Sequence, residues 1–436
     1  MIHMEQRVLK KSTKMVLTLA LVFICLVLVY LLDKGVIGSS YTVRILRLAV
    51  IYALIGVSMN LVNGFTGVFS LGQAGFMAIG AYTVGVLTIP IEAKANVYYL
   101  IPINEWLANV HLPFWAALLL GGVLAAVFAG LIGAPVLRLR SDYLAIATLG
   151  FSEIIRAIIA NNQMAPITNG SLGLKSVPGF TSLFVPVLIS AACIAFMVML
   201  IRSSYGRAFK AIREDEVAAE AMGINLFGHK ELSFVISAFF AGIGGGLLAA
   251  HLTAVDTNQF KIAVTYELLL IIVLGGLGSV TGTVISAFLI SFGKEWLRWF
   301  DASHTIGGVN IPIFRPGLRM VIFSLLLMAV VLFWRRGLMG QKEFSWDGIY
   351  NFFLRWGDRI KRLMRGEIHR GKKADMEGKA AAKAGSEAEA DGKAQGKEKA
   401  AGKAAAEAEA DGEVRAAEEA GEKLREESPK GGGASE

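Results

Sequence analysis

The sequence predicts an all-α polytopic membrane protein with about eight transmembrane helices, a re-entrant hairpin and a disordered C-terminal tail. Of its 436 residues, 54% are hydrophobic and only 18% are charged. A soluble protein needs about a quarter of its residues charged to cover its surface. The apolar residues also gather in runs of about 20, the length that crosses the hydrocarbon core of a bilayer.

The predicted spans set the division of the chain into segments. The eight apolar runs lie at about 15–32, 45–63, 70–90, 114–136, 142–161, 181–201, 232–252 and 317–334. We therefore predict an N-terminal tail at 1–14, a transmembrane domain at 15–340, an interfacial amphipathic helix at 341–370 and a disordered tail at 371–436. That last tail consists mainly of Ala, Gly, Lys, Glu and Asp, which bury too little apolar surface to form a core.

The basic residues predict the orientation of the spans. The formal net charge is +8, and residues 1–340 hold 24 Lys and Arg against 15 Asp and Glu. Within this part, the basic residues gather in the N-terminal tail, at Arg138 and Arg140, and in the loop 203–231. Short loops rich in Lys and Arg stay in the cytoplasm. Both termini are therefore predicted to be cytoplasmic, and the charge indicates a membrane protein rather than a nucleic-acid-binding one.

A glycine-rich break interrupts the apolar run from Tyr266 to Phe292. One more full crossing here would place the C-terminus on the opposite side from the N-terminus. A hairpin of two half-helices, broken at Gly275, Gly276 and Gly278, keeps both termini on one side. A continuous tilted helix of 27 residues is the alternative.

Polar and glycine residues are unusually dense in the run 63–82. Small residues let backbone segments approach a translocation path, and buried amides need internal partners. The alternative is tight helix packing with satisfied polar groups. Together with the three hairpin glycines, the candidate residues for this path are Asn63, Gly64, Ser70, Gly72, Gln73 and Gly75.

Glu153 and Arg156 form a second candidate site. Glu153 lies about 16 Å along its span from Asp142, near the middle of the bilayer. Arg156 follows three residues later, on the same helix face and within reach of an ion pair. Charged residues at this depth face the protein interior and are functional candidates. The alternative is a structural pair that holds two helices in register.

The loop 203–231 is the third candidate site. Its apolar residues Phe209, Ile212, Val217, Ala219 and Met222 are spaced to line one side of a short helix. An exposed helix with an apolar stripe needs a partner, which is another protein or the membrane domain of this chain. The two cysteines, Cys25 and Cys193, lie in separate apolar runs and the six histidines are scattered, so the sequence predicts no metal site and no cofactor.

At this loop the sequence resembles the "EAA" coupling loop of ABC importer permeases. The stretch GRAFKAIREDEVAAEAMGI is similar to the version in permeases for branched-chain amino acids. Four further stretches resemble that family in the same order, namely NGFTGVFSLGQAGFMAIGAY at 63–82, SEIIR at 152–156, TNGSLGL at 168–174 and LGGLGSVTG at 274–282. The resemblance covers about residues 45–336 and is strongest to the larger, LivM-type subunit.

The resemblance implies a bacterial inner-membrane importer. It would contain a paralogous permease subunit, two cytoplasmic ABC ATPase subunits and an extracytoplasmic protein that binds leucine, isoleucine or valine. ATP hydrolysis would then belong to separate subunits, and the arginine-rich helix near 349–365 would contact anionic lipids. The residues implied in coupling to the ATPase are Gly206, Arg207, Ala211, Ile212, Arg213, Glu216, Ala218, Ala219, Met222 and Gly223.

Two alternatives stay open at the level of sequence. A related ABC permease for urea or short amides would carry the same motifs, because substrate choice rests largely with the binding protein. An ion-coupled secondary transporter or channel would use Glu153 and Arg156 as its ion site. The amphipathic loop 203–231 argues against the second alternative, since a self-sufficient transporter needs no docking helix.

Overall fold

The computed structural model describes residues 11–36, 39–139 and 141–297, and a few positions after them: 305–306, 309–310, 321–322, 324–325, 328, 332, 337–340 and 343. These residues belong to a compact unit, Leu9–Trp346. The second unit, Met1–Val8 with Asp347–Glu436, lies outside the described residues. The predicted C-terminal tail falls in that unit, as does most of the predicted amphipathic helix. Most of the predicted span 317–334 belongs to the first unit but also lies outside the described residues, so all three stay predictions.

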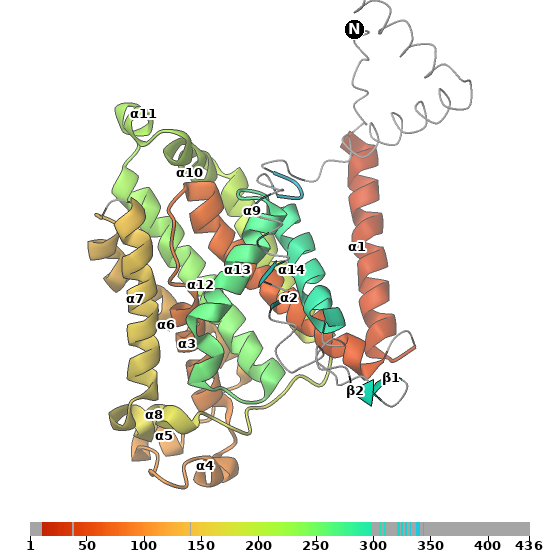
Figure 1. The fold of residues 1–436 in the computed structure, drawn as a ribbon, viewed down its shortest axis with the longest axis vertical. Helices are drawn as coiled ribbons and strands as arrows, with labels where there is room; N and C mark the ends of the chain where they lie inside the picture. Colours follow the sequence, from red (N-terminus) through yellow and green to blue (C-terminus); the bar gives the residue numbers. More distant parts are fainter. Residues whose placement is uncertain are drawn as a thin grey trace, which may run out of the picture. The chain divides into compact units, whose positions relative to one another are not determined.

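The described part of the chain is almost entirely helical, as predicted (Figure 1). The elements, in chain order, are α1 (Lys11–Asp33), α2 (Ser40–Asn60), the π-helix η1 (Leu61–Thr66), α3 (Gln73–Thr88), α4 (Ile91–Val97), α5 (Glu105–Ala108), α6 (Phe114–Val136), α7 (Ser141–Ala160), η2 (Asn162–Met164), α8 (Ala165–Thr168), η3 (Gly170–Leu172), α9 (Phe184–Arg202), α10 (Ser204–Glu214), α11 (Glu216–Ala221), α12 (Leu226–Leu252), η4 (Thr257–Phe260), α13 (Ile262–Gly275), α14 (Val280–Trp296), β1 (Thr305–Ile306) and β2 (Val309–Asn310). The two short strands pair antiparallel.

Six of the described helices are long and apolar enough to cross a membrane. They are α1, α2 continued by η1, α6, α7, α9 and α12. A seventh arises if α3 and α4, which bend by 119° at their junction, count as one span. Six of the predicted spans are confirmed in this way. The predicted span 70–90 is shorter than expected, because α3 starts only at Gln73 and ends at Thr88.

The core forms where α12 packs against α3, α6 and α2. Fifteen of the residues of α12, more than half the helix, are buried, which explains why this helix is apolar on all sides. Glycines let the backbones touch: a methyl group on Gly80 of α3 would overlap the Gly242 carbonyl of α12, and one on Gly242 would lie 2.8 Å from the Gly121 carbonyl oxygen of α6. Small residues therefore serve helix packing within this chain.

The two ends of the bundle differ. Helices α10 and α11 lie at one end, called here the α10 end, and the short helices α4, α5 and α8 lie at the other, the α4 end (Figure 1). The loop after α6 shares the α10 end, because the Arg138 guanidinium lies 5.5 Å from the centre of the Phe227 ring at the start of α12. The prediction that the loops after α6 and α9 share one side is therefore confirmed.

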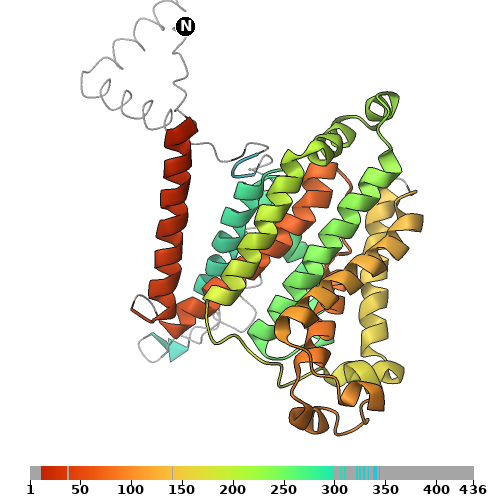
Figure 2. The same ribbon diagram turned by 180° about the vertical axis from the view of Figure 1, so that it is seen from behind.

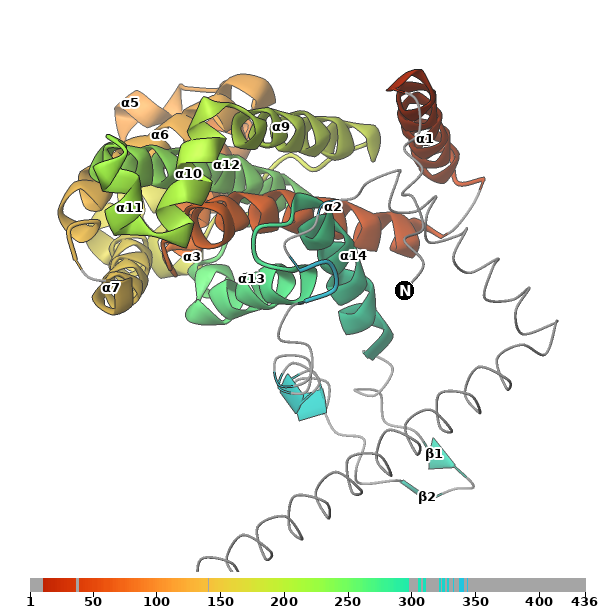
Figure 3. The same ribbon diagram turned by 90° about the horizontal axis from the view of Figure 1, so that it is seen from above.

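Helix α1 stands beside the bundle in all three views (Figures 1, 2 and 3). Its last turn makes the attachment: the Asp33 carboxylate accepts hydrogen bonds from the Leu183 amide at 2.5 Å and the Ser182 hydroxyl at 2.9 Å, just before α9. Most other apolar side chains of α1 are exposed. A lipid-facing helix has this pattern of exposure.

The break predicted between 275 and 282 is present. Helix α13 ends at Gly275 and α14 begins at Val280, capped by the Ser279 hydroxyl. The helices run antiparallel, since Lys294 near the end of α14 pairs with Glu267 near the start of α13 at 2.7 Å. With 14 and 17 residues, they extend about 21 and 25 Å at 1.5 Å per residue, further than half-helices would. The continuous tilted helix is therefore wrong.

Candidate functional site

Helices α10 and α11, called here the α10–α11 element, form a compact unit outside the spans. Asp215 separates the two helices, and its carboxylate caps α11 by accepting from the Ala218 amide at 3.0 Å. Gly223 follows α11 with a φ of +81°, a conformation that favours glycine and ends the helix. Lys230 of α12 pairs with Glu216 at 2.6 Å and holds α11 against the bundle.

The apolar residues of this element do not share one side, and that prediction is wrong. Phe209, Ile212 and Ala219 are 0%, 1% and 4% exposed, because they pack against the rest of the chain. Val217 and Met222 are 79% and 82% exposed. The prediction treated the loop as one short helix, whereas Asp215 divides it into two helices with different orientations of their side chains. Only the second set is available to a partner.

The other predicted coupling residues divide in the same way. Gly206 is buried where α10 turns from α9, so close to the Ile201 carbonyl that a methyl group would overlap it. Ala211 and Arg213 are half-buried. Arg207, Glu216, Ala218 and Gly223 are exposed. A methyl group on Gly223 would meet nothing within 4 Å.

Arg213 joins the α10–α11 element to the membrane domain. Its Nη1 donates to the Gly64 carbonyl oxygen at 3.0 Å, and its guanidinium also pairs with Glu214. Gly67 lies against its stem, where a methyl group would be 2.9 Å from Arg213 Cγ, and Gly278 lies against its head, where a methyl group would be 2.7 Å from Nη1. Three segments distant in sequence therefore meet at one side chain.

The glycine-rich run is not one helix. After η1, residues 67–72 have no helical structure, and α3 begins at Gln73. Asn63 closes this segment with two bonds of 3.1 Å, from its Nδ2 to the Ser70 carbonyl and from the Ser70 amide to its Oδ1. Gln73 Nε2 donates to the Ser58 hydroxyl at 2.7 Å. Non-helical backbone between spans is tolerated where it is buried in protein like this.

The glycines of this run face two different neighbours. Gly64 touches the turn between α13 and α14. Gly72 and Gly75 face α7, where a methyl group on Gly75 would lie 2.9 Å from Ser152 Cα. The predicted need for internal partners and close backbone approach is confirmed. The structure thus brings the predicted path glycines into contact with α7 and with the α13–α14 turn.

Glu153 and Arg156 form the predicted ion pair. Arg156 Nη2 and Nε each lie 2.7 Å from Glu153 Oε2. Glu153 is about 18 Å along α7, a helix of about 30 Å. The side chains of Arg156 and Glu153 remain 27% and 35% exposed, whereas Ser152 and Ile155 on the same helix pack against Gly75. The pair therefore lies at the edge of the outer face of α7, away from the glycine-rich run.

The turn between α13 and α14 has glycines in conformations that favour glycine, and residues further along the chain bind it. Gly276 and Gly278 have φ values of +114° and +85°, which favour glycine. The Leu338 amide donates to the Leu274 carbonyl at 2.7 Å. The Glu343 carboxylate accepts from the Val280 amide at 2.7 Å, at the start of α14.

Asn60 is the residue that sequence reasoning missed. It is fully buried at the end of α2, and its amide binds the α13–α14 turn: Nδ2 donates to the Ser279 carbonyl at 3.0 Å and to the Thr283 hydroxyl at 2.7 Å, and Oδ1 accepts from the Gly278 amide at 2.9 Å. An amide inside an apolar span was the available signal, because such a group requires partners. Those partners are more than 200 positions away and could not be read from spacing.

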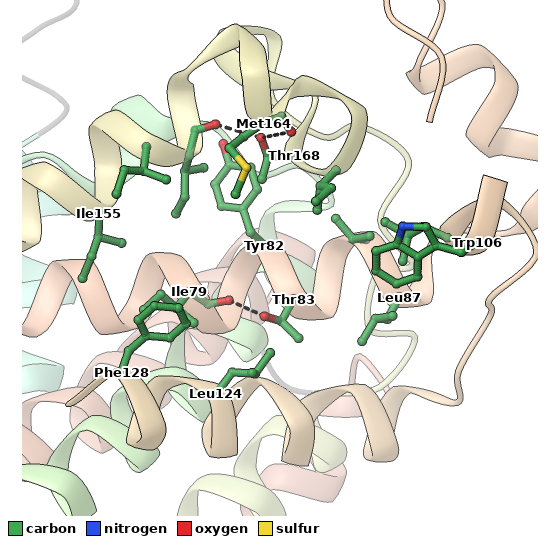
Figure 4. Close-up of a pocket in the computed structure, with 15 residues that line it drawn as sticks. Ile79, Tyr82, Thr83, Leu87, Trp106, Leu124, Phe128, Ile155, Met164 and Thr168 are labelled. Atoms are coloured by element: carbon green, nitrogen blue, oxygen red, sulfur yellow. Dashed lines mark hydrogen bonds between the residues drawn. The ribbon is translucent and has the colours of Figure 1, made fainter. Parts of the chain in front are cut away.

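An apolar cavity of about 340 Å³ lies between α3, α6, α7 and α8 (Figure 4). Its two threonine hydroxyls are turned to backbone carbonyls: Thr83 donates to Ile79 at 2.7 Å, and Thr168 donates to Ile159 at 2.8 Å. The buried hydroxyl of Tyr82, which also lines the cavity, makes no hydrogen bond. None of its 15 lining residues is charged. It therefore offers no ion pair to a charged ligand and is distinct from the Glu153–Arg156 pair, which lies elsewhere on α7.

The described residues contain no group of three or more His, Cys, Asp or Glu side chains that could hold a metal ion. Cys25 and Cys193 are both free. Neither observation adds a site to the α10–α11 element, the glycine-rich run and the Glu153–Arg156 pair.

Comparison with known proteins gives a consistent set of relatives. Residues 41–332 match the family described as branched-chain amino acid transport system / permease component. The chain is 34% identical over 316 residues to the high-affinity branched-chain amino acid transport system permease protein LivM of Escherichia coli, covering 64% of this chain and 69% of that protein. It is 23% identical over 319 residues to the probable branched-chain amino acid transport permease protein LivM of Methanocaldococcus jannaschii, covering 67% and 91%.

A more distant relative carries a different substrate name. The chain is 25% identical over 281 residues to the L-arabinose transport system permease protein AraH of Escherichia coli, covering 63% of this chain and 80% of that protein. No solved structure matches the chain.

Proposed function

This chain belongs to the family of branched-chain amino acid transport system permease components, and on that premise we propose that it forms, with a paralogous permease, the path by which an ABC importer carries leucine, isoleucine or valine. The predicted importer contains two cytoplasmic ATPase subunits and an extracytoplasmic binding protein. The relatives named for branched-chain amino acids support this substrate class.

One observation carries the proposal for ATPase coupling. The α10–α11 element is anchored to the bundle through buried Phe209 and Ile212, while Val217 and Met222 stand out at 79% and 82% exposure. Exposed apolar side chains on a rigidly held element are typical of a docking surface. An ATPase subunit at this surface would place the α10 end and the loop after α6 in the cytoplasm. The basic loops support that orientation.

The translocation path is proposed at the outer face of α7 and the glycine-rich run behind it. A pair of charges halfway along a spanning helix cannot face lipid at low cost. Because Glu153 and Arg156 are about a third exposed in the single chain, a second permease subunit or an aqueous path has to cover them. We place the path between the two permeases at this face, with the glycines at Gly72 and Gly75 allowing α3 to approach α7. Anionic lipids are proposed at the arginine-rich C-terminal helix.

Copurification and uptake test this function together. The chain, expressed with the ATPase, permease and binding-protein genes of its own locus, should copurify with an ATP-hydrolysing subunit. Reconstituted vesicles that contain the complex should take up radiolabelled leucine only when ATP is supplied to the ATPase subunits inside. Unlabelled isoleucine and valine should compete with the labelled leucine. Competition by urea or short amides instead would reassign the substrate.

The same vesicles separate an importer from an ion-coupled transporter. Leucine uptake driven by a proton or sodium gradient, without an ATPase subunit present, would overturn the proposal. A complex whose ATPase is inactivated in its own nucleotide site is the matched control, since it retains every membrane subunit.

A further inference from the structure

The end of α2 is attached to the α13–α14 turn by one buried amide. Asn60 is 0% exposed. Its Nδ2 donates to Ser279 and Thr283, and its Oδ1 accepts from Gly278. A turn between two helices leaves backbone groups without intrahelical partners. Asn60 supplies those partners from a different helix, so the turn cannot shift without either moving Asn60 or breaking these bonds.

The same stretch of chain is held from the other side by Arg213. Gly64, which accepts the Arg213 bond at 3.0 Å, lies one helical turn after Asn60. The head of Arg213 also rests on Gly278, so that a methyl group there would lie 2.7 Å from Nη1. Arg213 belongs to α10. The α10–α11 element, the end of α2 and the α13–α14 turn are therefore in direct contact.

Two of the segments that meet here lie beside a break in helical structure: the non-helical residues 67–72 follow η1, and residues 276–279 separate α13 from α14. A helix end next to a break can shift without losing intrahelical hydrogen bonds. The π-helix η1 begins directly after Asn60 and contains Gly64. Helices of this form are often found at functional sites.

We propose that Asn60 and Arg213 are positioning residues that pass a displacement of the α10–α11 element to the α13–α14 turn. Arg213 carries the movement of α10 to the end of α2, and Asn60 carries it on to the turn. This inference rests on the proposed function, because it requires an ATPase that displaces α10. It adds a second moving part, the α13–α14 turn with the two helices that it joins.

A spin label at Leu277 detects movement of the turn. Leu277 is 43% exposed, and the chain has only two cysteines to replace, by Cys25→Ser and Cys193→Ala. In the assembled complex, the spectrum of the label on Leu277→Cys should change when ATP is added. Asn60→Ala and Arg213→Ala should each abolish that change in the spectrum. Each should also lower the number of leucine molecules transported per ATP hydrolysed by about 5-fold or more, which is the lower end of the effects typical of coupling between two sites.

Two further variants separate transmission from folding. Thr283→Val removes one acceptor of the Asn60 amide, together with the bond from the Thr283 hydroxyl to the Ser279 carbonyl at 2.7 Å, and keeps the side-chain shape. It should therefore reduce the label response even if Asn60→Ala does not fold. Ser237→Ala is the matched control, because it removes another buried bond to the end of α2, from the Ser237 hydroxyl to the Ser58 carbonyl at 2.6 Å. It should leave the label response and the coupling ratio unchanged.

The outcomes distinguish this inference from the proposed function. An unlabelled complex that lacks ATP-driven leucine uptake would overturn the proposed function itself. Two results would overturn only the proposed roles of Asn60 and Arg213. One is a complex that transports leucine but shows no ATP-dependent change in the label at position 277. The other is a change that persists undiminished in Thr283→Val and Arg213→Ala. Partial retention in Arg213→Lys, with loss in Arg213→Ala, would support it, since lysine keeps one donor.

Discussion

Gly80 of α3 and Gly242 of α12 lie in backbone contact, so that a methyl group on Gly80 would overlap the Gly242 carbonyl. These helices form the centre of the core. Gly80→Ala should therefore push α3 away from α12 and destabilise the protein by about 1–3 kcal/mol, the usual cost of overpacking. The loss of folded protein on heating in detergent measures this effect.

Gly293→Ala is the matched control for that substitution. Gly293 lies within α14, and a methyl group there would meet nothing within 4 Å. Alanine favours a helix over glycine by about 0.8–1.0 kcal/mol, so this variant should be as stable as the parent or more stable. Equal heat stability of Gly80→Ala and Gly293→Ala would contradict the packing described for α3 and α12.

The exposed residues of the α10–α11 element should affect transport without affecting folding. Met222→Asp and Val217→Asp replace side chains that are mostly exposed, so the protein should reach the membrane in normal amount but lose ATP-driven uptake. Ile212→Asp should behave differently, because Ile212 is 1% exposed and its replacement buries a charge. It should lower the amount of folded protein. Normal uptake in the Val217→Asp, Met222→Asp double variant would remove the docking assignment.

Gly223 can be tested against a glycine of the same geometry. Gly223 and Gly35 have φ values of +81° and +69°, and a methyl group on either would meet nothing within 4 Å. Alanine at each position should cost about 1–2 kcal/mol of backbone strain. Only Gly223→Leu, at the α10 end, should also block ATPase docking and reduce uptake; Gly35→Leu should not. Equal uptake by the two leucine variants would mean that Gly223 only ends a helix.

Glu153 and Arg156 should be coupled in a double-mutant cycle. Removing one partner leaves a charge uncompensated halfway along a span, which costs up to about 3–5 kcal/mol where burial is complete, while removing both is milder. Glu153→Gln and Arg156→Gln should each lower folded protein more than the double variant does. The Glu216–Lys230 pair, which joins α11 to the beginning of α12 and whose Glu216 side chain is 56% exposed, is the control and should give at most about 1 kcal/mol. Additive losses at 153 and 156 would contradict the contact.

The C-terminal tail gives a prediction from sequence alone. Truncation after Arg370 should leave assembly and uptake intact, because the removed residues bury too little apolar surface to offset an ordering cost of about 1–2 kcal/mol per residue. Truncation after Arg336 should lower the yield of complex, since it also removes the amphipathic helix. A strong uptake defect at equal protein amount in the first truncation would reveal a partner of the tail.

The spans and the helix break were predictable because they depend on local composition. Long apolar runs such as 114–136 became helices of nearly the same bounds, and three glycines within four residues marked the end of α13. The ion pair of Glu153 and Arg156 was predictable for the same reason, since its members are three residues apart. Local signals suffice where the partner lies on the same helix.

Contacts between distant segments were not predictable in the same way. Hydropathy separated the spans 45–63 and 70–90 but did not reveal that residues 70–72 are not helical, because an extended apolar stretch and a helical one have the same composition. Periodicity placed Ile212 and Met222 on one stripe, although one packs inward and the other points outward. Asn60 was overlooked in favour of Asn63, since its importance depends on the turn at Gly278, 218 positions away.

The hydrogen bond from the Leu183 amide to the Asp33 carboxylate has a consequence for biosynthesis. The two residues are 150 positions apart, so at about 5–20 residues per second the ribosome needs roughly 8 to 30 s to make Leu183 after Asp33. During that interval α1 lacks its attachment to α9, and the neighbours already made for its buried residues Val29 and Leu32 are Val43 and Leu46 of α2. Helix α1 also precedes the segment 41–332 that matches the family. The attachment of α1 therefore forms in two stages, first beside α2 and then, once Leu183 has been made, at the start of α9.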